Sequence, residues 1–176
     1  MTTYTYVTNL RRKLSNTINK YNRNLTPLGV RVIKYNNPDR FRVAYGTANR
    51  NSGITVNTDP VKMRAWLTTG HTHPNNQGKG IALALRTFAV AILKNSGFVR
   101  VNHQGVNYNF TRSNESARRT NYLPITTYIV RKYLGFRPVG NNSNGNFRSK
   151  WRTSYPQQKL RNAKNLSRRK LETLLH

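Results

Sequence analysis

The stretch HTHPNNQGKGIA, which covers residues 71–82, joins a strand-like segment to the most apolar helix-like segment of the chain. Its glycines allow the backbone to turn tightly, and they carry no Cβ atom that would keep an anion away. A glycine-rich turn between a strand and a helix exposes unpaired backbone N–H groups beside the positive end of the helix dipole. The stretch therefore predicts a phosphate-binding turn. Its spacing matches neither the Walker loop nor the G-x-G-x-x-G dinucleotide fingerprint.

Residues 78–95, which follow this turn, form the clearest predicted helix. Large apolar residues and alanines fill it, and only Arg86 and Lys94 interrupt them with strongly polar side chains. A helix that is apolar nearly all round is usually buried, so we expect this one to pack against a sheet. The run Asn95-Ser96-Gly97 ends it.

The other expected elements lie on both sides of the turn. Before it we expect an amphipathic helix over 7–22, a hairpin of strands 30–35 and 41–45, a strand after residue 53 and a strand near 63–69. After the buried helix we expect a strand at 98–101, a helix over 125–134, a strand-like segment at 136–139, a linker at 141–148 and a basic C-terminal helix. This order predicts a mixed α/β domain over residues 1–140, with a basic amphipathic helix within 1–24. Residues 141–176 are expected to form a basic linker and helical tail.

Two motifs resemble those of the GNAT superfamily of N-acetyltransferases. The first matches the signature Q/R-x-x-G-x-G/A and comprises Gln77, Gly78, Lys79, Gly80, Ile81 and Ala82. The second, LGFRPVG over 134–140, resembles the family's L-G-F-x-x-x-G ending. The resemblance covers about residues 5–140. It implies a central mixed, mostly antiparallel sheet flanked by helices.

The resemblance also implies a cofactor and its contacts. In the family, the signature turn grips the pyrophosphate of acetyl-CoA, and the end of the preceding strand lines the pantetheine arm. Here that strand end is near residues 70–73 and includes Thr72 and His73. Asn114 begins a segment that resembles the family's N-x-x-A motif, which can contact CoA.

The catalytic candidates are Tyr128, His73 and Glu115. Acyl transfer to an amine needs a base for the amine and an acid for the leaving thiolate. The family often places a tyrosine as this acid four residues before the glycine of Leu-Gly-Phe, but Arg131 occupies that position, and Tyr128 lies one turn earlier. No metal site is expected, because no cysteine or nearby carboxylate completes a ligand set around the histidines.

The charge of the chain points to an anionic polymer. Lys and Arg number 31 against 4 Asp and Glu, a formal net charge of +27. Arginine forks pair with phosphate, and the interleaved aromatic residues can stack on bases. We therefore expect nucleic acid or another polyanion as a partner and no membrane contact. The predicted nucleic-acid contacts are Arg11, Arg12, Lys13, Arg118, Arg119, Arg168, Arg169 and Lys170.

Two functions stay open at this point. The first is an acetyl-CoA-dependent N-acetyltransferase that works in contact with nucleic acid. The alternative is a catalytically degenerate GNAT-like protein, either structural or nucleic-acid-binding, such as a phage or viral virion component within a larger nucleoprotein assembly. The absence of cysteine excludes disulfides and thiolate zinc sites, and we expect a location in the cytoplasm or inside a virion.

Overall fold

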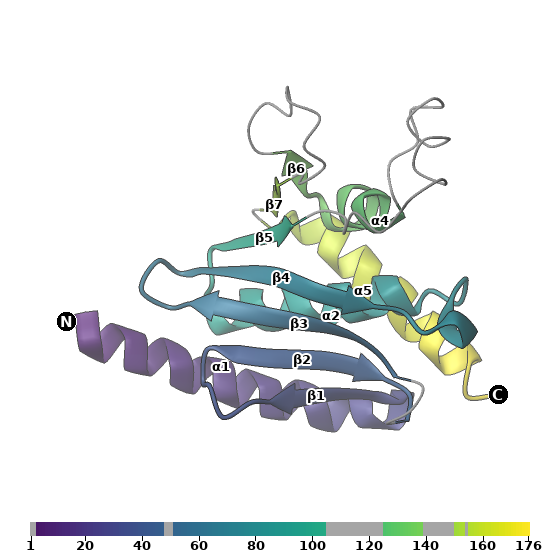
Figure 1. The fold of residues 1–176 in the computed structure, drawn as a ribbon, viewed down its shortest axis with the longest axis horizontal. Helices are drawn as coiled ribbons and strands as arrows, with labels where there is room; N and C mark the ends of the chain where they lie inside the picture. Colours follow the sequence, from purple (N-terminus) through teal and green to yellow (C-terminus); the bar gives the residue numbers. More distant parts are fainter. Residues whose placement is uncertain (1–2, 48–50, 105–124, 139–149, 154) are drawn as a thin grey trace.

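A seven-stranded mixed sheet forms the centre of the computed structural model, which describes residues 3–47, 51–104, 125–138, 150–153 and 155–176 (Figure 1). The strands are β1 (Val30–Lys34), β2 (Arg40–Tyr45), β3 (Ser52–Asp59), β4 (Arg64–His71), β5 (Arg100–Gln104), β6 (Arg137–Pro138) and β7 (Lys150–Thr153). Their order in the sheet is β1-β2-β3-β4-β5-β7-β6. All neighbouring strands are antiparallel except β4 and β5, which are parallel. The expected mixed, mostly antiparallel sheet is confirmed.

The helices pack on one face of this sheet (Figure 1). They are α1 (Thr3–Leu25), α2 (Ile81–Ser96), α4 (Ile125–Leu134) and α5 (Gln157–Thr173), with the short 3₁₀ turns η1 (Thr26–Leu28) and η2 (Pro74–Asn76). Alternate residues of the strands, such as Phe41, Val43, Ile54 and Val56, are buried in one core with the apolar residues of the helices. This arrangement agrees with the GNAT-like architecture that the two sequence motifs implied.

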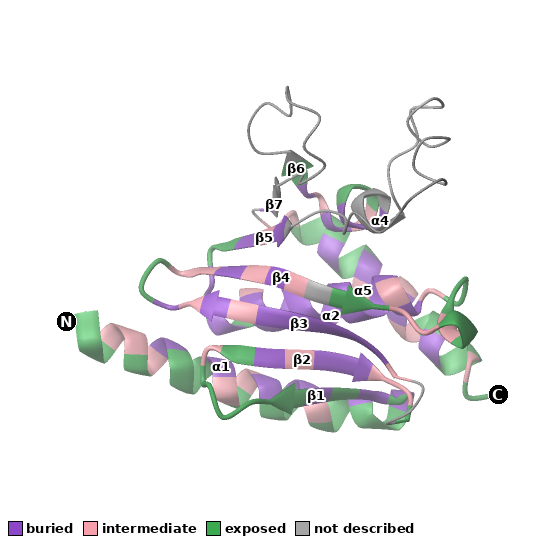
Figure 2. Ribbon diagram, viewed as in Figure 1, coloured by how far each residue is buried: buried purple, intermediate pink, exposed green. Residues whose placement is uncertain are grey.

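Helix α2 lies at the centre of the core, as its composition predicted. Nearly all of its residues are buried, and Figure 2 shows it enclosed between the sheet and the other helices. Gly80 begins the helix and Gly97 ends it, both in the left-handed conformation. Helix α1 buries an apolar stripe that includes Leu10, Leu14 and Ile18, which confirms the amphipathic helix and extends it at both ends.

The expected linker at 141–148 lies outside the described residues, but the residues described after it do not form a separate tail. Strand β7 lies between β5 and β6 in the central sheet, and α5 packs against α2 and α4. Leu160, Ala163 and Leu171 of α5 are buried in the common core. The boundary at residue 140 therefore does not separate the described residues into a domain and a tail. In α5 the basic residues outnumber the buried apolar residues. For this reason its composition resembles that of a solvated tail.

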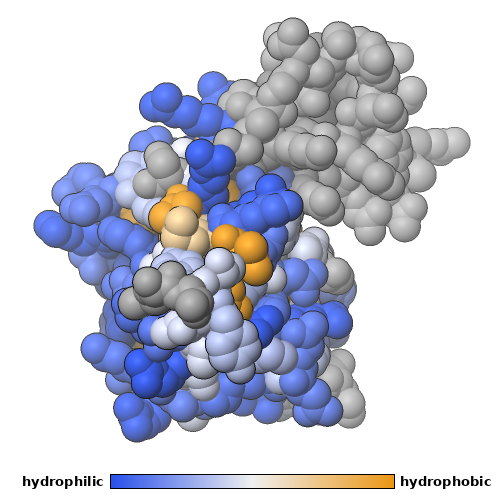
Figure 3. Space-filling view, turned by 90° about the vertical axis from the view of Figure 1, so that its left-hand side faces the viewer, coloured by the Kyte–Doolittle hydropathy of each residue, from blue (hydrophilic) through white to orange (hydrophobic). Residues whose placement is uncertain are grey.

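The surface is mostly hydrophilic. Figure 3 views the end of the molecule that carries the β3–β4 turn and shows a small apolar patch within a polar surface. Val61 and Val99, which are 61% and 48% exposed, lie at this end. Within the described part of the chain, no helix combines the length and apolar character needed to cross a bilayer.

Candidate functional site

The turn between β4 and α2 is fastened to the neighbouring strand β3. The backbone N–H of His73 and the side-chain amide of Asn76 both donate hydrogen bonds of 2.9 Å to the buried hydroxyl of Ser52. The His73 ring nitrogen Nδ1 accepts a bond of 3.2 Å from the N–H of Asn75 and caps η2. These hydrogen bonds hold residues 73–76, the part of the turn that precedes the two glycines. Ser52 was not singled out from the sequence, because its role depends on a contact between distant residues.

The two signature glycines both have the left-handed backbone conformation, with φ of 73° at Gly78 and 79° at Gly80. Among the described loop and turn hydrogen bonds, none is donated by the N–H groups of Gly78, Lys79 or Gly80. The first turn of α2 adds further N–H groups, because the N–H groups at the start of a helix have no carbonyl acceptor within the helix. A Cβ atom at Gly78 would meet nothing within 4 Å, so the space beside the backbone is open. The turn thus has the backbone conformation that the sequence predicts, and its binding of an anion stays a prediction.

Lys170 of α5 also belongs to this turn. A Cβ atom at Gly80 would collide with its aliphatic chain, and the Cε atom lies 3.3 Å from that position. The sequence had placed Lys170 in a nucleic-acid contact, because it follows Arg168 and Arg169 directly. The fold carries its aliphatic chain across the beginning of α2, where a cation adds to the positive end of the helix dipole. Its contact with nucleic acid stays a prediction.

Strand β4 loses its β5 partner just before the turn. Their parallel ladder runs from Arg64 opposite Arg100 to Leu67 opposite His103 and ends there. The last two residues of β4, Gly70 and His71, remain paired with β3. Among the described residues, their other edge has no strand beside it, and Figure 1 shows β5 diverging from β4 towards this end. No described strand therefore pairs with the N–H and C=O groups on that edge.

A β-bulge in β4 marks this divergence. Two residues, Thr68 and Thr69, lie opposite the single Thr55 of β3, since Ile54 pairs with Gly70 and Val56 with Leu67. The extra residue reverses the alternation of side chains, so that position 70 faces the helices. A Cβ atom at Gly70 would lie 3.0 Å from Cδ1 of the core residue Ile54. Bulges of this kind occur often beside active sites.

Arg86 of α2 lies against the bulged strand on the helix side. Its Nη2 atom is 2.8 Å from the Cβ position of Gly70, and its Nη1 donates a bond of 3.0 Å to the carbonyl of Ala82. The side chain is buried, with only 5% of its surface exposed. Its Nε has no partner among the described residues. A buried guanidinium without a carboxylate is unusual, because desolvation of the charge is costly.

His103 of β5 is the second buried polar group near the gap that opens where β4 and β5 diverge. It is the last β5 residue paired with β4, it is 4% exposed, and its Nδ1 has no partner among the described residues. Burial and, to a smaller extent, the charge of Arg86 together lower the pKa of His103 to about 3. Burial alone lowers the pKa of Arg86 to about 10. At neutral pH the gap therefore holds a neutral imidazole and a charged guanidinium.

The other predicted site residues have mixed outcomes. Gln77 and Lys79 are exposed on the turn, Thr72 is half-buried, and Ile81 is buried in the core. Because Nδ1 of His73 accepts a hydrogen bond, the neutral ring carries its proton on Nε2, so this arrangement does not make His73 a general base. Tyr128 lies within α4. Asn114, Glu115, Arg118 and Arg119 lie outside the described residues.

The remaining basic clusters predicted from the sequence lie on the helical side of the molecule. Arg11 of α1 forms a salt bridge with Asp39. Arg12 donates to the side chain of Asn9, and Lys13 is exposed on α1. Arg168 and Arg169 lie on α5. Arg11 is thus already paired with a carboxylate. The other four basic residues lie on the surfaces of α1 and α5.

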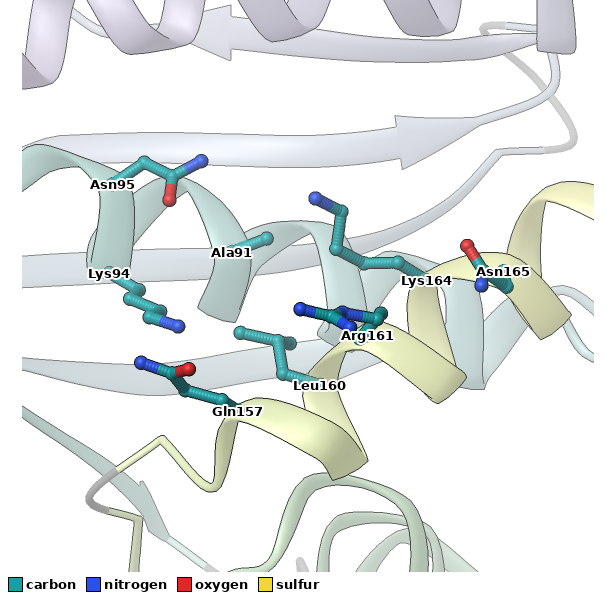
Figure 4. A pocket seen from close by; sticks show the side chains of 8 residues that line it. All are labelled: Ala91, Lys94, Asn95, Gln157, Leu160, Arg161, Lys164 and Asn165. Carbon is teal, nitrogen blue, oxygen red and sulfur yellow. The ribbon is translucent and has the colours of Figure 1, made fainter.

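A separate cavity of about 190 Å³ lies between α2 and α5 (Figure 4). It is lined by polar side chains, including the cations Lys94, Arg161 and Lys164. It contains no carboxylate or histidine. Among the described residues, no group of three or more His, Asp or Glu side chains is arranged to hold a metal ion.

Comparison with known proteins finds similarity only among solved structures. No family model and no curated protein matches the sequence. The similar structures include a nourseothricin acetyltransferase, Tetrahymena GCN5 and BjaI, a CoA-dependent acyl-homoserine lactone synthase solved with SAM and isopentyl-CoA. Their sequence identities are 16%, 10% and 13%, and the TM-scores are 0.41, 0.40 and 0.48.

The similar regions cover 65%, 85% and 93% of this chain and 64%, 86% and 83% of the three others, in the same order. The chain thus spans less than two thirds of the nourseothricin acetyltransferase. Likenesses this weak say nothing about activity. The fold description rests on the strand order and helix placement given above.

Proposed function

We propose that this protein is an acyl-CoA-dependent acyltransferase of the GNAT type that works in contact with nucleic acid. The observation that carries the proposal is the turn itself. The end of β4, which pairs with no described strand on one side, leads into two left-handed glycines at the beginning of a buried helix. The N–H groups of these glycines have no acceptor among the described residues. A diphosphate fits this arrangement, because backbone N–H groups and the helix dipole attract anions without a fixed side chain.

The residues around the turn fit CoA in three places. Gly78 and Gly80 would hold the pyrophosphate, with Lys79 and Lys170 as cations beside it. The free edge of β4 at residues 68–71 would pair with the amides of the pantetheine arm, as an added strand does. Arg86 would direct a positive charge to the gap from the helix side. When bound, acyl-CoA supplies a thioester whose acyl group is transferred, and acetyl is the simplest such group.

The reaction requires two groups from the chain, a base for the amine and an acid for the thiolate. An amine nitrogen forms a bond to the thioester carbonyl carbon while the carbon–sulfur bond breaks, so the amine loses a proton and the thiolate gains one. Tyr128 remains our candidate for the acid that protonates the thiolate. Glu115, which lies outside the described residues, remains a candidate for the base. Of the described Asp and Glu side chains, Asp39 and Asp59 pair with Arg11 and Arg64, and Glu172 is exposed near the end of α5.

A GNAT-like protein that binds without turnover is the second candidate. It is favoured by the hydrogen bond that occupies Nδ1 of His73, and by the position of Arg131 where the family often has a tyrosine. Such a protein would keep the acyl-CoA site but release no free thiol in the presence of amine acceptors. Measurement of thiol release therefore separates the two candidates once binding is established.

The binding site is tested with two matched glycine variants. Gly78→Ala adds a methyl group to the proposed cradle, and Gly97→Ala adds one at the far end of the same helix. Both glycines have positive φ, so both variants are strained at a cost of roughly 1 kcal/mol. We expect calorimetric titration with CoA to show at least a tenfold loss of affinity for Gly78→Ala and none for Gly97→Ala. Equal losses in the two variants, or no CoA binding by the unmodified protein, would contradict the proposal.

A further inference from the structure

The sheet face opposite the helices carries arginines from five strands. They alternate with core residues, as Arg42 does between Phe41 and Val43, and as Arg100 does before Val101. This arginine face comprises Arg31, Arg40, Arg42, Arg64, Arg100 and Arg137. Among the described strand residues, the single carboxylate on this face is Asp59, which lies 3.5 Å from Arg64.

The strand pairing places these charges close together. Arg64 of β4 is directly opposite Arg100 of β5, and Arg31 and Arg42 lie on the adjacent strands β1 and β2. Like charges at opposite positions of a sheet destabilise it. The Arg42 guanidinium lies in the space that Gly53 leaves free, so it adds a further positive charge over the sheet. An anion bound along the face would relieve this repulsion, and six arginines across five strands match an extended polyanion better than a single phosphate.

An aromatic side chain lies among these cations. Trp66 of β4 is half-buried, and the Arg64 guanidinium is 4.9 Å from its ring centre. In the register it stands between Asn57 of β3 and Asn102 of β5. A second aromatic–arginine pair lies near the edge, where Arg40 is 4.7 Å from the ring centre of Tyr35. Aromatic rings between cations form a stacking surface for unpaired bases.

We infer that this arginine face is a binding surface for single-stranded nucleic acid. The phosphates contact the arginines, and a base stacks on Trp66. The surface differs from the sequence clusters on α1 and α5, which lie on the helical side. Trp66 is two residues before the bulge at Thr68, so a strand on this face also reaches the proposed acyl site. The inference specifies the nucleic-acid contact of the proposed function but does not depend on CoA binding.

The arginine face is tested by fluorescence anisotropy of a labelled oligothymidylate, titrated with the full chain in the absence of CoA. The face variant is Arg40→Gln/Arg100→Gln, and the matched control is Lys20→Gln/Arg23→Gln on α1. Both change two exposed cations. We expect the face variant to lose at least tenfold in affinity and to lower the slope of log affinity against log salt by about 1.4, since each phosphate contact on a single strand contributes about 0.7. The control should leave the slope unchanged.

A third variant separates stacking from charge. Trp66→Ala should weaken binding about tenfold without changing the salt slope, because a stacked base releases no counterion. Equal losses in the face variant and the control would show that only net charge attracts the strand, and would overturn the inference. Equal competition by polyglutamate would assign the face to acidic proteins instead. Because CoA is absent, a failure here leaves the CoA titration of the glycine variants as a separate result.

Discussion

Arg86 has a charge that the fold buries without a described carboxylate beside it. Such a residue costs stability, and a neutral side chain of similar length is often better tolerated at such a site. We predict that Arg86→Met raises the free energy of unfolding by about 1–4 kcal/mol while it lowers the affinity for acyl-CoA. The measurements are urea unfolding and calorimetric titration.

The half-exposed Lys94 on the same helix provides the control, and Lys94→Met should change stability by no more than about 0.5 kcal/mol. A loss of stability in Arg86→Met would show that the guanidinium has a partner within the chain. That result would remove Arg86 from the proposed site.

Burial of His103 makes the free energy of unfolding depend on pH. Its pKa falls from the ordinary value of 6.5 to about 3 because burial disfavours the charged ring. The unfolded chain therefore binds a proton between these values that the folded chain does not. The contribution of His103 to the free energy of unfolding is fully present above pH 6.5. It is lost as the pH falls towards 3, by at most about 1.4 kcal/mol per pH unit.

Urea unfolding at pH 6 and pH 4 checks this prediction. The variant His103→Phe keeps an aromatic ring beside Phe136 but removes the titrating group. It should lose less stability between the two pH values than the unmodified protein does. Because both proteins keep the ion pair of Arg11 and Asp39, that contribution cancels. Equal losses would show that His103 is protonated in the folded state.

The elements that the sequence predicts best are those with local signals. The glycines of the turn and the apolar composition of α2 need no information about distant residues, and both predictions are confirmed. The bulge at Thr68–Thr69 has no such signal, since it depends on the register between β3 and β4. Arg86 is visible in the sequence only as an interruption of an apolar helix. Its place beside Gly70 follows from how α2 packs on the sheet.

The basic residues show the same limit at the level of elements. Runs such as Arg11-Arg12-Lys13 are conspicuous in the sequence, but Arg11 is paired with Asp39. The arginine face is built from single residues on separate strands, each of which resembles an ordinary outward position. Helix α5 was predicted, but its role in the core was not. Packing of Leu160 and Leu171 against the other helices depends on tertiary contacts.

The whole molecule separates its charge into two regions with different tasks. The helical layer encloses the core and brings Lys170 to the glycine turn, whereas the open face of the sheet presents arginines. The net charge of +27 is thus distributed over both faces of a folded protein. The proposed acyl-CoA turn follows the end of β4, between these two regions.

The most direct test of the central claim is amide NMR mapping with CoA. The claim is that the unpaired N–H groups of Gly78, Lys79 and Gly80 bind the pyrophosphate. The account predicts that the largest shifts of the amide signals occur at these three residues. Largest shifts at the cavity between α2 and α5, around Lys94, Arg161 and Lys164, would contradict the account, as would the absence of any shift.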